Sequence, residues 1–280
     1  MNMPLKYEIT NIQHRDYSNL FRIRALRDIP PFNVKAGDLG GFIECEDNLS
    51  QDGDCWIGDT ARVSGELGRN IGDLDPVLKP KVYGNALVCG NARVFDNAQI
   101  FGNAQVYGNA RVYGNAVVCG SATVTGDACV FHNATVTDDA IVYDSSRVFH
   151  QSQIRGKAHV FGESLVFMTA RVYGKARVYG NAQITGGQVL GNAQIYEDAQ
   201  IHDNAKISGN AKIHGSVIVN YKVKINKKMD ISGAAYLGAS NQIYYSGGIT
   251  AYFDIDRNLV VNGESADIEH HKTLARLKLS

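Results

Sequence analysis

The sequence has little proline, few cysteines and no long apolar run. Only 5 of its 280 residues are proline, and its 5 cysteines include no Cys-x-x-Cys pair. An odd number of cysteines without that spacing argues against a disulfide framework and the usual zinc sites, and it predicts a reducing, cytoplasmic environment. No apolar stretch approaches the ~18 residues of a membrane span. The amino terminus also lacks the basic start and apolar run of a secretory signal.

Net charge is absent as well. The chain carries 28 Lys and Arg against 28 Asp and Glu, which argues against a chain-wide basic surface for nucleic acid or an anionic membrane. Apolar residues make up 44% of the chain, too many for disorder. We therefore expect a folded protein whose partners include neither nucleic acid nor a membrane.

Glycine, with 29 residues, is abundant and recurs on a pattern. Every sixth residue is Val or Ile from Val82 to Ile184, and again from Val189 to Val219 after one shortened step at Gly187. Ala or Ser stands two positions before nearly all of them, and Gly-Asn or Gly-Asp often follows. Such a fixed short period is typical of a repeat architecture.

The spacing has a direct physical interpretation. An Ala-x-Val triplet alternates inward and outward, so it predicts a short strand with one small and one branched side chain inside. Gly and Asn accept the positive φ of a sharp corner most readily. Three successive hexads complete one coil, and each coil stacks on the coil below through parallel ladders. The pattern predicts an all-β, single-stranded parallel β-helix, and a period of six excludes an amphipathic helix.

The ends of the chain are irregular and predict caps. Residues 7–10 and 21–26 are strand-like but too charged for a solenoid interior, and the hexad pattern begins weakly at Ile43, Leu49 and Cys55. We expect a β cap over 1–42, a solenoid over 43–231 with a loop insertion at about 65–81, and a second cap over 232–280. That second cap is predicted to hold longer strands, a β-hairpin and a short helix starting near Ser265. Caps protect the open edges of a solenoid.

The repeat resembles that of a known superfamily. The [Val/Ile]-x-Gly-[Asn/Asp]-Ala-x hexads are similar to those of the bacterial hexapeptide-repeat proteins, which implies a left-handed β-helix. Gly40-Gly41-Phe42-Ile43-Glu44 and Cys55-Trp56-Ile57 resemble the entry segment of the YdcK-like branch. This branch occurs in bacteria and prophages and is usually described as acyltransferase-like. The resemblance implies acetyl-CoA or another acyl-CoA as cofactor, a small acceptor as substrate, and a homotrimer.

The chain departs from the enzymes of this superfamily in two respects. An aromatic residue often follows the aliphatic one, where the acyltransferases favour a small or acidic residue, and no His has the neighbours expected around their catalytic His. The carbonic-anhydrase branch binds zinc through three His, two of them separated by five positions. No such pair occurs here, so no metal site is predicted.

One face is predicted to carry an aromatic stripe. Positions three hexads apart stack on one another, and the stripe consists of Phe95, Tyr113, Phe131, Phe149 and Phe167. Two positions earlier on the same face lie Arg93, Arg111 and Arg147. The corresponding columns on the other faces are interrupted by Cys, Thr or Arg, so we expect a single stripe. Its rings could stabilise each other, lie in a threefold interface, or with the arginines bind a planar anion such as a nucleotide or the adenosine end of coenzyme A.

Two histidines follow the stripe at its corner. His132 and His150 replace the corner Gly of their hexads. They are either solvated and inert, or one is the general base that deprotonates an acceptor hydroxyl or amine. His159, His202 and His214 occupy outward strand positions and are weaker candidates, whereas Cys89, Cys119 and Cys129 have no His beside them in the repeat to activate a thiol.

Three functions are compatible with these features. The first is an acyl-CoA-dependent transferase, and the second is a non-catalytic protein that binds or sequesters a small ligand. The third is a structural spacer or interaction protein. The loop at 65–81 favours the first two, because a pure spacer has no need to interrupt its coils.

Overall fold

A computed structural model gives the fold of the chain. The structure describes residues 4–65, 79–220, 223–225, 230–237, 243–245, 250–253 and 259–262. The chain divides into two compact units, residues 1–145 and 146–280, and each unit is described by itself.

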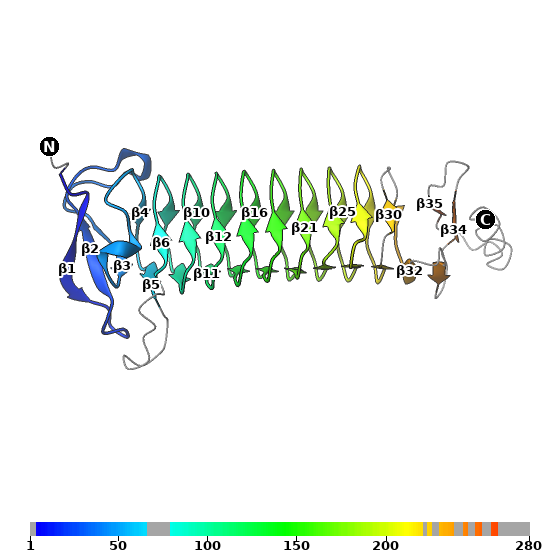
Figure 1. Cartoon of the computed structure of the whole chain (residues 1–280), viewed down its shortest axis with the longest axis horizontal. Coiled ribbons are helices and arrows are strands. Elements are labelled where there is room, and N and C mark those ends of the chain that lie inside the picture. Colours follow the sequence, from blue (N-terminus) through cyan, green and yellow to red (C-terminus); the bar gives the residue numbers. More distant parts are fainter. Residues whose placement is uncertain are drawn as a thin grey trace. The chain divides into compact units, whose positions relative to one another are not determined.

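Unit 1 is a parallel β-solenoid with an amino-terminal cap. Each coil places three short strands on three faces, and the strands of successive coils pair in parallel (Figure 1). On the first face lie β3 (Leu39–Ile43), β5 (Arg62–Ser64), β8 (Arg93–Phe95), β11 (Arg111–Val112) and β14 (Cys129–Val130). On the second lie β6 (Lys81–Val82), β9 (Gln99–Ile100), β12 (Val117–Val118) and β15 (Thr135–Val136). On the third lie β4 (Trp56–Ile57), β7 (Leu87–Val88), β10 (Gln105–Val106), β13 (Thr123–Val124) and β16 (Ile141–Val142).

The amino-terminal cap of unit 1 is antiparallel. Strand β1 (Tyr7–Gln13) pairs with β2 (Phe21–Ala25), and β2 pairs with β3, which in turn pairs in parallel with β5. Both strand-like runs predicted from the sequence are therefore strands. Two 3-10 turns, η1 (Pro30–Phe32) and η2 (Glu46–Asn48), lie in the connections. The antiparallel strands cover the edge that the first coil would otherwise leave open.

Unit 2 has the same coil architecture on three faces of its own. Its first face holds β17 (Arg147–Val148), β20 (Leu165–Phe167), β23 (Gln183–Thr185), β26 (Gln200–His202), β29 (Ile218–Val219) and β32 (Ala235–Leu237). Its second holds β18 (Gln153–Ile154), β21 (Arg171–Val172), β24 (Gln188–Val189), β27 (Lys206–Ile207) and β30 (Lys224–Ile225). Its third holds β19 (His159–Val160), β22 (Arg177–Val178), β25 (Gln194–Ile195), β28 (Lys212–Ile213) and β31 (Asp230–Ile231).

One side of one coil in unit 2 is a residue short. Arg171 pairs with Gln188 and Val172 with Val189, so the step between these partners is one position shorter than three hexads. Gly187 occupies the buried position before this strand, and an added Cβ would lie 2.7 Å from the Ile201 side chain. The shortened step predicted from the sequence is thus accommodated by a residue without a side chain.

The end of unit 2 combines described strands with a segment outside the described residues. Strand β33 (Ile243–Tyr245) pairs antiparallel with β32, and β34 (Thr250–Phe253) pairs antiparallel with β35 (Leu259–Asn262). The hairpin expected here is confirmed. The helix predicted from Ser265 lies outside the described residues, as do residues 66–78 of the predicted loop.

The inward positions form the core that the hexads predict. Ala116 and Val118 are both fully buried, as are the Val, Ile and Ala residues at equivalent positions through both units. Ser146, Ser152 and Ser164 replace Ala at three such positions, and their hydroxyls donate to the backbone oxygens of Val160, Phe149 and Val178 respectively. A core only one small and one branched side chain deep per strand leaves no room for a larger residue.

The corners depend on left-handed backbone conformations. Gly114 has φ +69°, and an added Cβ would lie 2.8 Å from the backbone nitrogen of His132. Side chains beside the corners form ladders, in which the Asn97 amide donates to Asn115 and the Asn115 amide to Asn133. The described residues confirm an all-β parallel β-solenoid, and hexads on this fold support the left-handed winding expected from the resemblance.

Candidate functional site

The predicted aromatic stripe is a stack of rings in unit 1. The Phe95 and Tyr113 centroids are 4.7 Å apart with planes 3° from parallel, and those of Tyr113 and Phe131 are 4.8 Å apart at 4°. All three side chains are half-buried. The rings cover one another's faces, so a ligand alongside the stack would contact mainly ring edges.

Arginines lie beside this stack. Arg93 and Arg111 are register partners on β8 and β11, two positions before Phe95 and Tyr113. Arg93 is half-buried and Arg111 is exposed. The two arginines and the rings thus lie on the same face, as the sequence predicted. Guanidinium groups beside apolar ring edges are suited to an anion, and that use of the face stays a prediction.

The remaining members of the predicted stripe belong to unit 2. Phe149 and Phe167 stack with centroids 5.0 Å apart and planes 2° from parallel. Arg147 precedes Phe149 on β17 and is exposed. Within each unit, the part of the stripe that the sequence predicted is a stack of parallel rings.

The two corner histidines have left-handed backbones. His132, in unit 1, has φ 57°, and His150, in unit 2, has φ 59°. Each ring tilts against the aromatic residue before it, with centroids 4.9 Å apart for Phe131 and His132 and 4.8 Å for Phe149 and His150. Each histidine is thus packed on the edge of its stack.

A second aromatic stack contradicts the prediction of a single stripe. Phe161, Tyr179, Tyr196 and His214 stack along the third face of unit 2, with successive centroids 4.8, 4.9 and 4.5 Å apart and planes within 6° of parallel. The one-residue-short coil hid this column, because the step from Tyr179 to Tyr196 is one position shorter than three hexads. Counting from the shortened step would have revealed it.

Arginine lies directly over this second stack. The Arg177 guanidinium carbon is 5.3 Å from the Phe161 ring centroid and 5.9 Å from that of Tyr179. Contacts of this kind are electrostatically favourable. Arg177 therefore covers ring surface that a ligand would otherwise contact.

His214 ends the second stack and is held by carboxylates. Its Nε2 lies 2.7 Å from Oδ1 of Asp230, and its Nδ1 lies 3.6 Å from Oε2 of Glu197. Glu197 is itself positioned, because its carboxylate accepts the Gly215 backbone N–H at 2.7 Å. A carboxylate on one ring nitrogen sets the tautomer and orientation of an imidazole, which makes His214 a better candidate base than its strand position suggested.

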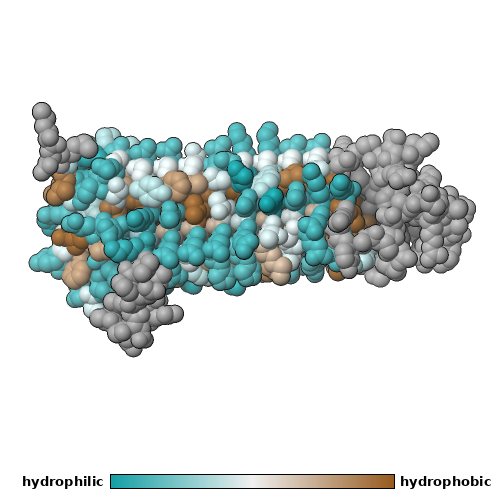
Figure 2. Space-filling view, in the orientation of Figure 1, coloured by the Kyte–Doolittle hydropathy of each residue, from teal (hydrophilic) through white to brown (hydrophobic). Residues whose placement is uncertain are grey.

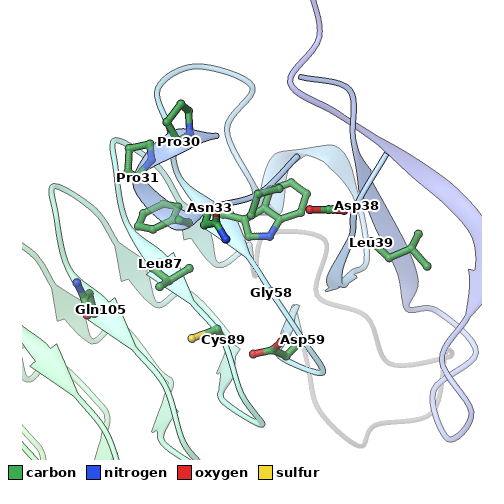
Figure 3. A pocket seen from close by; sticks show the side chains of 13 residues that line it. Pro30, Pro31, Asn33, Asp38, Leu39, Gly58, Asp59, Leu87, Cys89 and Gln105 are labelled. Carbon is green, nitrogen blue, oxygen red and sulfur yellow. The ribbon is translucent and has the colours of Figure 1, made fainter. Parts of the chain in front are cut away.

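A groove lies where the cap of unit 1 meets the third face. Its volume is about 690 Å³, and its lining includes Pro30, Pro31 and Phe32 of η1 together with Trp56 and Leu87. Pro30 and Pro31 lie on one side and Leu87 on the other (Figure 3). Trp56 is the only tryptophan in the chain, and it is buried beneath the cap. The groove was not predictable from the hexad pattern, although Pro30-Pro31 and the single Trp are its local signals in the sequence.

Two carboxylates give the groove a negative character. Asp38 and Asp59 both line it, and the Asp59 carboxylate points toward Cys89 (Figure 3). Burial, and then the charge of Asp59, raise the pKa of the Cys89 thiol. This thiol is therefore a poor nucleophile, and the lining suits a ligand with an apolar body and a positive group.

A second hollow, of about 960 Å³, lies beside η2 and the second face of unit 1. Its lining includes Glu46, Asp47, Lys79, Lys81 and Tyr83. The Lys79 ammonium lies 2.6 Å from an Asp47 carboxylate oxygen. Its charged groups of both signs partly neutralise each other, which gives this hollow less charge selectivity than the groove.

The outer surface is largely polar in the view of Figure 2, with scattered hydrophobic residues. Within the described part of the chain, no group of three or more His, Cys, Asp or Glu side chains could hold a metal ion. The described residues likewise contain no helix long and apolar enough to cross a membrane.

A comparison with known protein families also identifies a β-solenoid repeat in this chain. The family model of the YdcK β-solenoid repeat matches residues 104–120, a segment spanning β10, β11 and β12 of unit 1. The chain is a β-solenoid repeat protein of the YdcK type. No curated protein matches it. The YdcK-type repeat identifies the fold, and function has to be argued from the sites.

Proposed function

We propose that this YdcK-type solenoid is a non-catalytic binding protein whose ligand site is the groove between its cap and the third face of unit 1. The observation that carries the proposal is a concave groove of mixed lining, in which the apolar side chains of Pro31, Phe32 and Leu87 lie beside the two carboxylates of Asp38 and Asp59. A concavity that offers apolar surface together with a few placed polar groups can bind and orient a small molecule. The ligand class it favours is a small amphipathic cation.

The sole tryptophan provides the test. Trp56 lines the groove, so its fluorescence reports occupancy without competing signal from another tryptophan. Phenethylamine and phenylacetate have the same ring and opposite charges. We expect the amine to change Trp56 fluorescence saturably, and Asp59→Asn to weaken that binding.

A matched pair of variants locates the binding site. Leu87 and Ile141 are both half-buried outward residues on the third face of unit 1, but only Leu87 lines the groove. Leu87→Lys should abolish the response and Ile141→Lys should retain it. Equal binding of amine and acid, or equal loss in both variants, would contradict the proposal. Native mass spectrometry of freshly purified protein would additionally reveal a ligand that co-purifies.

Acyl transfer is a second candidate function, favoured by the contact between His214 and Asp230. With Nε2 donating to Asp230, Nδ1 is the nitrogen left to take a proton, and an acceptor hydroxyl or amine would have to enter between Nδ1 and the Glu197 carboxylate 3.6 Å away. The acyl donor would be acetyl-CoA. Because its thioester is already activated, no protein nucleophile is needed and one oriented base would suffice.

The assay follows free thiol release from acetyl-CoA in the presence of an acceptor panel. His214→Gln should reduce turnover by ~10²–10⁴-fold while ligand binding survives. His132→Gln and His150→Gln test the two corner histidines in the same assay. If the aromatic stripe of unit 1 binds the adenosine end of acetyl-CoA, Arg111→Ala and Phe131→Ala should instead weaken the binding of acetyl-CoA. Absence of thiol release with every acceptor would leave the binding function alone.

A further inference from the structure

Lys6 and Cys55 form a buried pair at the amino-terminal end of unit 1. The Lys6 Nζ lies 2.9 Å from the Cys55 Sγ, and neither residue is exposed to solvent. The Lys6 Nζ also lies 3.4 Å from the backbone oxygen of Asp52, which is a long contact. A lysine this deeply buried normally has a carboxylate partner, yet here its closest partner is a thiol.

The surrounding structure holds both groups in place. The Lys6 backbone N–H donates to Oε1 of Gln51 at 2.8 Å, and the amide of the same Gln51 donates to the backbone oxygen of Tyr7. Cys55 stands two positions before Ile57, where Ala stands in the regular hexads, and its N–H donates to Gly84. The thiol therefore points into the end of the core, and the lysine side chain reaches it from the cap.

The chemistry of the pair follows from its burial. Burial lowers the pKa of the Lys6 amine, although the nearby Cys55 opposes that shift. Burial also raises the pKa of the Cys55 thiol, again opposed by its partner. Burial thus favours a neutral amine beside a neutral thiol, which are the forms that bury at least cost.

We propose that Lys6 and Cys55 are a modification site, at which peroxide links the two side chains through one oxygen atom as Nζ–O–Sγ. Inserting one oxygen leaves the nitrogen and sulfur near their present separation. A direct N–S bond would require them to approach by most of a bond length within a packed core. The observed geometry therefore favours the oxygen bridge over the direct bond.

The reaction balances with hydrogen peroxide as the oxidant. The first peroxide converts the thiol to a sulfenic acid and releases one water, with sulfur losing two electrons. The second removes the sulfenic O–H hydrogen and one amine hydrogen as the N–O bond forms, and it is reduced to two waters. The amine keeps one hydrogen, and two peroxides become three waters in all. Pro4 and Leu5, just before Lys6, are exposed, so local opening of this end admits water together with the small oxidant. Burial no longer raises the pKa of the hydrated Cys55 thiol in the opened state, and its thiolate is the form that peroxide oxidises.

The bridge would fasten the start of β1 to the first coil. The two residues are 49 positions apart in sequence, so the link closes a long loop and restricts the unfolded chain. We expect oxidised protein to unfold at a higher temperature than reduced protein, and dithiothreitol to reverse the difference.

The test uses the full chain, treated with hydrogen peroxide under native conditions and then denatured and alkylated. We expect a mass gain of one oxygen less two hydrogens, a Cys55 that resists alkylation, and a peptide containing Lys6 joined to one containing Cys55. Trypsin should no longer cleave after Lys6. Lys6→Met keeps an unbranched apolar stem and should give sulfenic or sulfinic Cys55 without a link, whereas Cys89→Ser should still form it.

Several results would overturn the proposal. A loss of two hydrogens without a gain of oxygen would show a direct N–S bond, and a Cys55 sulfinic acid in the wild-type chain with unmodified Lys6 would show no link. Because the wild-type mass and peptide map decide the question by themselves, the proposal stays testable even if Lys6→Met fails to fold. Lys6→Arg provides a further variant that keeps a long side chain but lacks the primary amine.

Discussion

Phe95 and Tyr113 lie three hexads apart in the sequence, yet their rings stack with centroids 4.7 Å apart and planes 3° from parallel. That separation is the repeat distance of the solenoid, since Arg93 and Arg111 in the same two strands are register partners. The rings on the outer surface therefore repeat at the same spacing as the coils. The contribution of their stacking to the free energy of unfolding can be measured.

We expect the loss of the central ring to destabilise unit 1. Tyr113 stacks on both Phe95 and Phe131, so Tyr113→Leu removes two stacked contacts of about 0.5–1.5 kcal/mol each. Tyr113→Phe keeps the ring and should be close to neutral. Urea unfolding of a Phe95→Leu, Tyr113→Leu double-mutant cycle measures the coupling, and strict additivity would contradict a stacking contribution.

The inward positions are expected to dominate stability. Val118 is fully buried while Val117, its neighbour on β12, points outward. Val118→Asp places an unpaired charge in the narrow core and should cost several kcal/mol, whereas Val117→Asp serves as a matched control with a small effect. Ala116→Leu should cost about 1–3 kcal/mol through overpacking. Thermal melts in which the two Asp variants behave alike would refute the inward assignment.

The corner histidine offers a test of strain against function. His132 has φ 57°, a conformation that costs a residue with a side chain about 1–2 kcal/mol. His132→Gly should therefore be slightly stabilising in urea, whereas Gly114→Ala should destabilise, because its Cβ would meet the His132 backbone. If His132→Gly also leaves ligand binding and thiol release unchanged, this residue has no functional role.

Acid should weaken unit 2 through His159. Burial, and then the Arg177 guanidinium, lower the pKa of His159 from its ordinary value of 6.5. Below that value the unfolded chain binds a proton that the folded chain does not, so stability falls as pH drops through 6.5 toward the folded pKa. His159→Gln should flatten this part of the pH dependence in urea unfolding. Arg177→Gln should flatten it less, because the burial remains, and an unchanged slope in both variants would exclude His159 as the cause.

Self-association remains a prediction for solution measurement. The resemblance implies a homotrimer, and the half-buried ring edges of the unit 1 stack, with Phe95 and Tyr113 among them, offer an apolar strip for it. Light scattering at micromolar concentration should give three subunits, and Tyr113→Glu should reduce that number. A stable monomer for the wild-type chain would reject the homotrimer and favour a freely accessible stack.

The sequence by itself determined the coil. A branched residue every sixth position, a small residue two before it and a residue tolerant of positive φ at the corner specify strand, core and turn locally, so Ala116, Val118 and Gly114 could be placed without a structure. Even the step at Gly187, which is one residue shorter than a hexad, was predicted from the spacing of the branched residues. These features were predictable because each depends on neighbours within one hexad.

Only the tertiary structure revealed the sites that depend on the shortened coil or on the cap. The stack of Tyr179 on Tyr196, the contact of His214 with Asp230, and the groove between Pro31 and Leu87 join residues from different coils or from cap and coil. The pairing of Lys6 with Cys55 likewise depends on how the cap folds over the first coil. A periodic sequence specifies what repeats, but the irregular cap and the shifted coil obey no period, and side chains meet there only after the chain has folded in three dimensions.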